Sequence, residues 1–102
     1  MNAQSSPQVG QLVEILKGKD AGEVAVVINV IDSRFVYIAD GDKRKFDMPK
    51  KKSILHLKLL PIVSSEIVNS LKESGRVTNG KLRFAVMKFV KSTDKSANEK
   101  GD

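Results

Sequence analysis

Short runs of apolar, often β-branched residues, separated by Gly, Asp and Pro, constrain the fold of this chain more than any other feature. The run at 24–31 is nearly continuous, which is typical of a strand buried on both faces. Four other runs have strand character: 12–16, 34–39, 43–47 and 54–60. Five short strands within about fifty residues predict a mainly β fold, a small antiparallel barrel that needs no helical crossovers.

After Pro61 the pattern becomes helical. Ser64 or Ser65 can cap a first helix that Gly75 ends, and Thr78 can cap a second. Apolar residues then recur at helical spacing: Leu82, Ala85, Val86, Phe89 and Val90. A strand over 83–90 is the competing interpretation, but we favour a short helical extension. The expected organisation is a flexible leader (1–9), a barrel (10–61), the helical extension (62–91) and a disordered tail (92–102).

The positive charge is concentrated in one segment. The 102 residues include 18 Lys and Arg against 12 Asp and Glu, a net charge of +6. Residues 42–58 alone hold seven basic and two acidic side chains, a net of +5. Such a patch attracts polyanions, of which nucleic acid is the commonest in a cell, although a solvated face that maintains solubility is the alternative.

Composition excludes several kinds of site. The chain has no Cys and a single His, His56, so thiolate metal sites and paired-histidine catalysis are not available to it. His56 stands in an apolar run without a neighbouring acid–base partner. We therefore expect no enzyme activity, cofactor, metal or small-molecule substrate. No apolar stretch reaches the roughly 20 residues that a membrane-spanning helix needs, and the absence of Cys fits the cytoplasm.

Residues 10–27, from Gly10 to Val27, resemble a KOW motif: a strand, a loop with a Gly at position 22 and a second apolar strand. The continuation through Val30-Ile31-Asp32, Phe35-Val36, Asp40-Gly41 and Arg44 is similar to large-subunit ribosomal proteins of the fourteen-e and twenty-seven-e type. The match covers about half of the chain, 10–60. The segment 77–83 also resembles the helical extension of small bacterial KOW-domain RNA-binding proteins.

This resemblance implies an SH3-like barrel that binds RNA, ribosomal RNA foremost, with ribosomal proteins as further partners. Basic side chains would contact phosphates, which position a protein without reading sequence, while arginines can also fork onto a phosphate or stack on a base. The expected contacts lie in the KOW loop, in the hairpin arm 43–45 and in an exposed lysine loop 50–52. The candidate RNA-binding residues are Lys17, Lys19, Gly22, Arg34, Lys43, Arg44, Lys45, Lys50, Lys51, Lys52 and His56.

Several alternatives stay open at this level. The loop is less basic than is usual in the family, because Asp20 and Glu23 offset Lys17 and Lys19. The clustered lysines could instead protect a β-edge from aggregation. The cations between residues 76 and 91 could lie along RNA or belong to a helix that only braces the barrel. The rival function is a protein-interaction module of the translation or transcription machinery.

Overall fold

The computed structural model describes residues 6–101, and it describes side chains as far as Ser92. Its elements are β1 (Gln11–Ile15), β2 (Val24–Val30), β3 (Phe35–Ala39), β4 (Lys50–Ser53), the 3₁₀ helix η2 (Ile54–His56), β5 (Leu57–Val63), α1 (Ser65–Ser74) and α2 (Asn79–Gly101). Residues 1–5 of the expected leader, 1–9, lie outside the described residues. Of the expected tail, 92–102, the backbone is described through residue 101, as the end of α2.

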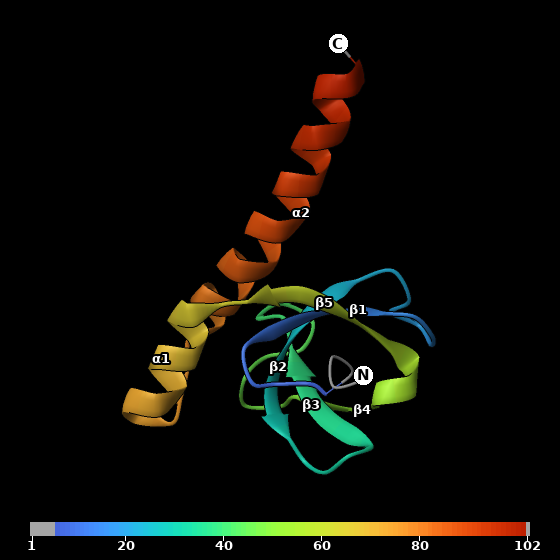
Figure 1. Ribbon diagram of the computed structural model, residues 1–102. Helices are drawn as coiled ribbons and strands as arrows, with labels where there is room; N and C mark the ends of the chain where they lie inside the picture. The colour runs from blue at the N-terminus through green and yellow to red at the C-terminus, as the bar shows by residue number, and fades with distance from the viewer. Residues whose placement is uncertain (1–5, 102) are drawn as a thin grey trace.

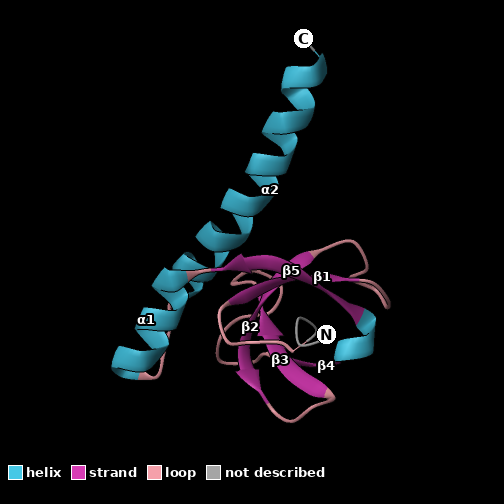
Figure 2. Ribbon diagram, in the orientation of Figure 1, coloured by secondary structure: helices cyan, strands magenta, loops and turns pink. Residues whose placement is uncertain are grey.

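The five strands form one antiparallel sheet in the order β4-β3-β2-β1-β5. The sheet curls, so that β5 and β1 lie across the barrel from β3 and β4 (Figure 2). Two shifts of register, one in β1 and one in β2, accompany this curvature. The predicted fold class, a mainly β SH3-like barrel followed by helices, is confirmed.

Both faces of the central strands are buried, as the apolar run at 24–31 predicted. Val13, Ala25 and Val27 point into the barrel interior, where they pack with Val36 and other apolar side chains of β3 and β5. The intervening residues of β1 and β2 point outward into a second cluster, which the helices cover. That cluster consists of Leu12, Val26, Ala39, Leu60, Ile67, Val77 and Leu82.

α1 begins and ends, and α2 begins, where their capping residues predict. The Ser64 hydroxyl accepts a hydrogen bond from the backbone N–H of Ile67, and Gly75 closes α1 in the left-handed conformation with φ of 75°. The Thr78 hydroxyl accepts from the N–H of Lys81 at the start of α2. Residues 83–90 are helical, so the preferred interpretation is confirmed, and α2 projects beyond the barrel (Figure 1).

The prediction of a strand at residues 43–47 is wrong, because the backbone of this segment bonds elsewhere. The Asp40 carboxylate accepts from the N–H groups of Asp42 and Arg44, which extends the turn past Gly41. The N–H of Phe46 donates to the Asn79 side chain at the start of α2. The strand that pairs with β3 on the side away from β2 is instead β4, the segment predicted to be a lysine loop.

The predicted last strand, 54–60, is also displaced. Its first three residues form η2, and β5 continues through Pro61 to Val63. Proline is compatible with this position because β5 is an edge strand, where a missing N–H need not break a ladder. The sheet therefore extends two residues beyond the proline that was expected to end it.

Candidate nucleic-acid interface

The loop between β1 and β2 is closed by its own backbone. Gly22 has φ of 95°, a conformation that favours glycine, and its N–H donates to the Ile15 carbonyl oxygen at 2.7 Å. The N–H of Ile15 donates back to the Glu23 carbonyl oxygen. The amide of Gly22 is thus used inside the loop, while the space where a side chain would stand is open.

Lys52 connects β4 with this loop. Its Nζ donates to the Lys17 carbonyl oxygen at 3.1 Å, across 35 positions of sequence. Lys52 stands opposite Val36, and Lys50 stands opposite Ile38. Directly opposed residues share a face of the sheet, so both lysines emerge on the side of the buried barrel interior, at its β1–β2 loop end.

Four cations meet at this end of the barrel. Lys50 and Lys52 from β4 join Lys43 and Arg44 from the β3–β4 connection around one small hollow of about 10 Å³. We call these four residues the basic cluster. Part of the expected juxtaposition of residues 43–45 with 50–52 is therefore present, although residues 43–45 are not in a strand.

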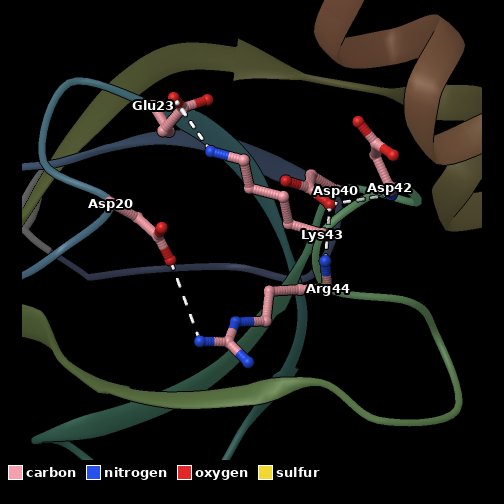
Figure 3. A network of polar contacts seen from close by, with 6 residues as sticks. All are labelled: Asp20, Glu23, Asp40, Asp42, Lys43 and Arg44. Atoms are coloured by element: carbon pink, nitrogen blue, oxygen red, sulfur yellow. Dashed lines mark hydrogen bonds and ion pairs between the residues drawn. The ribbon is translucent and has the colours of Figure 1, made fainter.

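Two acidic residues of the β1–β2 loop enter the same cluster (Figure 3). Glu23 Oε2 lies 3.4 Å from Lys43 Nζ, and Asp20 Oδ2 lies 3.9 Å from Arg44 Nη2. The side chains of both pairs keep a quarter to a half of their surface in solvent. The described ion pairs of these two carboxylates are therefore with Lys43 and Arg44 of the β3–β4 connection.

Lys51 faces the opposite side of β4. It is paired with Tyr37, and its Nζ lies 4.6 Å from the centroid of the Phe35 ring, a cation–π contact. Arg34 directly precedes β3, and its carbonyl oxygen accepts from the N–H of Ile54. The lysine run of residues 50–52 is thus split between two surfaces by the alternation of a strand.

The remaining candidates surround the cluster without a described side-chain contact to it. Lys17, Lys19 and Lys45 are exposed. His56 is exposed in η2, and its carbonyl oxygen accepts from the N–H of Leu16, which places it beside the base of the β1–β2 loop. All four side chains are therefore accessible to solvent.

The basic residues just before and at the start of α2 make contacts within the protein. Arg76 pairs with Asp47 and stacks on Phe46. Lys81 Nζ donates to the Ser70 hydroxyl at 2.8 Å, and Arg83 donates to the Gly41 carbonyl oxygen at 2.7 Å. These three side chains hold α2 against α1 and the β3–β4 connection, which supports the bracing alternative for this part of the helix.

Asp32 shapes the turn between β2 and β3. Its carboxylate accepts from the N–H groups of Arg34 and Phe35 at 2.8 and 2.9 Å. These two hydrogen bonds stabilise the ionised form and lower the pKa of Asp32 below its usual 3.8, with a smaller contribution from the charge of Lys51. The turn thereby fixes the start of β3.

Within the described part of the chain, acidic and histidine side chains do not group in a way that could hold a metal ion. No helix among these residues has the length and apolarity needed to cross a membrane.

Comparison with known proteins identifies the barrel. A family model described as "KOW motif" matches residues 9–38, which hold β1, the β1–β2 loop, β2 and most of β3. The protein named "Putative ribosome-binding protein YbzG" from Bacillus subtilis (strain 168) is 44 % identical over 71 residues, which cover 70 % of this chain and 96 % of that relative. The barrel, its loop glycine and this similarity agree: the chain belongs to the family of small KOW-domain proteins.

Proposed function

We propose that this protein is a non-catalytic RNA-binding protein of the cytoplasm that associates with the ribosome and binds structured ribosomal RNA through its basic cluster. The observation that carries the proposal is the 44 % identity to a relative named for ribosome binding, which extends over nearly the whole of that relative. The basic cluster supports it, because it offers four cations within one small area.

The mechanism is neutralisation of phosphates. Lys43, Arg44, Lys50 and Lys52 project from two segments that meet at one end of the barrel, and Lys17 and Lys19 extend the same surface along the β1–β2 loop. Lysines that contact phosphates position a protein by the shape of the RNA backbone. Four such contacts predict that log K falls by about three for each tenfold rise in salt concentration.

The decisive variants separate the two faces of β4. The double variant Lys50→Gln/Lys52→Gln is expected to weaken binding to purified ribosomal RNA and to reduce the salt slope by about 1.5, since each phosphate contact contributes about 0.7–0.9 to the slope. Lys72→Gln, an exposed charge in the last turn of α1, is the matched control and is expected to change the slope little. Fluorescence anisotropy at several salt concentrations measures the affinity of each of these proteins for ribosomal RNA.

Lys51→Gln tests the other face of the strand. Because Lys51 lies over Phe35 and away from the basic cluster, its loss is expected to reduce the slope less than the single variant Lys50→Gln does. An unchanged slope in the double variant would contradict the proposed site. A failure of the wild-type protein to bind ribosomal RNA would contradict the proposed function itself.

A groove favours the second candidate, a protein-interaction module. Between β5 and α2 lies a depression of about 370 Å³, whose lining includes the partly exposed apolar side chains of Ile62, Val63 and Phe84. Lys88 and Glu66 contribute one charge of each sign to the lining. A largely apolar segment of a ribosomal protein is the occupant that this lining fits.

Co-sedimentation with ribosomes distinguishes the two candidates. If RNA carries the attachment, nuclease treatment and the Lys50→Gln/Lys52→Gln variant both release the protein, whereas Phe84→Ala does not. If the groove carries it, Phe84→Ala releases the protein, and binding to a nuclease-resistant ribosomal protein fraction persists.

A further inference from the structure

Two carboxylates of the β1–β2 loop contact cations of the basic cluster. Glu23 and Asp20 come from the β1–β2 loop, and each lies against a cation of the β3–β4 connection, roughly twenty residues further along the chain (Figure 3). Both pairs are partly exposed, so an incoming phosphate has access to the same two cations. A phosphate that contacts Lys43 or Arg44 must therefore share or replace a carboxylate.

The geometry of Arg44 leaves its guanidinium incompletely satisfied. Its contact with Asp20 is long, at 3.9 Å, and its Nε is buried without a hydrogen-bond partner. The nearby Asp40 carboxylate already accepts two backbone N–H groups through Oδ1, which it needs to hold the turn. A phosphate could accept from both Nη groups of the guanidinium, a better match than the single contact with Asp20, whereas the buried Nε is out of its reach.

The Lys43–Glu23 pair is similarly open to exchange. Its 3.4 Å contact joins two side chains that are about half exposed. Exposed ion pairs of this kind contribute little to stability, because solvent screens them and both side chains lose freedom. Exchange of such a carboxylate for a phosphate therefore requires little disruption of the fold.

We propose that Asp20 and Glu23 are internal competitors of RNA phosphate: they occupy Arg44 and Lys43 in the unbound protein and are displaced when RNA binds. This proposal rests on the proposed RNA-binding function and deepens it. An RNA that presents closely spaced phosphates displaces both carboxylates together, whereas an isolated phosphate meets two negative charges at the edge of the cluster. The carboxylates therefore lower overall affinity and favour compact, structured RNA.

The test removes the competing charges. Asp20→Asn and Glu23→Gln are each expected to tighten binding to ribosomal RNA by about two- to five-fold, and the double variant by about tenfold, since weak exposed pairs are being released. Single-stranded homopolymer RNA, a ligand without compact structure, should gain more than ribosomal RNA. Asp47→Asn is the matched control, because it removes the same charge and an ion pair with Arg76 outside the basic cluster.

A double-mutant cycle locates the effect. In a Lys43→Gln background, Glu23→Gln is expected to gain little affinity, because the pair it would release is already gone. In the intact wild-type protein, the side-chain carboxylate resonance of Glu23 should shift when ribosomal RNA is added. This measurement does not depend on the folding of any variant.

Different results would contradict this inference and the proposed RNA-binding function on which it rests. If wild-type protein binds ribosomal RNA but Asp20→Asn/Glu23→Gln binds no more tightly than Asp47→Asn, the competition is absent and the two carboxylates only tie loops together. A Glu23 resonance that stays unchanged while the Lys43 resonance shifts would overturn the displacement. Failure of the wild-type protein to bind ribosomal RNA would instead remove the proposed function.

Discussion

Two glycines with the same kind of backbone conformation have different roles. Gly22, in the β1–β2 loop, and Gly41, after β3, have φ of 95° and 82°. A side chain at Gly22 would meet open space, but one at Gly41 would collide with the first turn of α2, including the Asn79 carbonyl oxygen and the Leu82 side chain. The Gly41 carbonyl oxygen also accepts from Arg83. Gly41 is therefore a point of close contact between the β3–β4 connection and α2.

This difference predicts unequal costs for the same substitution. Gly22→Ala should lower the free energy of unfolding by about 1 kcal/mol, the cost of a left-handed conformation for alanine. Gly41→Ala should cost about 3 kcal/mol or more, because backbone strain is added to a clash with backbone atoms that cannot move aside. Urea denaturation measures both. Equal losses would mean that α2 does not pack against Gly41 as described.

At the scale of elements, the β2–β3 turn depends on an ionised carboxylate. Asp32 accepts two backbone hydrogen bonds, and its pKa is lowered from 3.8. A lowered pKa in the folded state means that folding favours the ionised form. The stabilisation is therefore fully present above pH 3.8 and is lost as the pH falls through the lower pKa of the folded protein.

The prediction is a pH-dependent difference between wild type and Asp32→Asn. Asparagine keeps an acceptor oxygen but does not titrate, so the variant should lose less stability than wild type between pH 5 and pH 2.5. Urea denaturation across this range measures it, and a carboxyl titration by NMR should place the Asp32 midpoint below 3.8. Parallel pH profiles for the two proteins would show that the carboxylate does not support the turn.

At the element scale, the sequence pattern predicts the wrong segment, 43–47, as the fourth strand. Residues 43–47 follow an Asp-Gly turn, which is a strong hairpin signal, yet their hydrogen bonds go to the Asp40 and Asn79 side chains. Residues 50–53 are rich in lysine and lack the apolar alternation of a strand, because β4 is an edge strand with little burial. Because successive side chains of a strand point to opposite faces, Lys51 lies on one face of β4 and Lys50 and Lys52 lie on the other.

At the scale of the whole molecule, the helices complete a core that the barrel leaves open. Leu12 of β1 and Val26 of β2 point away from the barrel interior into a cluster with Ile67 of α1 and Leu82 of α2. Ile67 and Leu82 are fully buried there. The barrel and the start of the helical extension therefore share one apolar core, and the helices are part of the folded unit.

Two substitutions on α2 test this shared core. Leu82→Ala removes a fully buried side chain and should lower the free energy of unfolding by about 2–5 kcal/mol. Phe84→Ala, at a side chain that is half exposed, should cost about 1 kcal/mol or less. A small loss for Leu82→Ala would mean that α2 folds without support from the barrel.

The sequence by itself determined the features that depend on near neighbours: the positions of β1, β2 and β3, the capping of α1 and α2, and the KOW loop with its glycine. These follow from alternation, capping and turn chemistry, which act over a few residues. Tertiary structure decided which segment pairs with β3, that Asp20 and Glu23 neutralise Arg44 and Lys43, and that the lysines of β4 face two sides. Each of these outcomes is a contact between segments distant in sequence, set by how the sheet curls and where α2 packs.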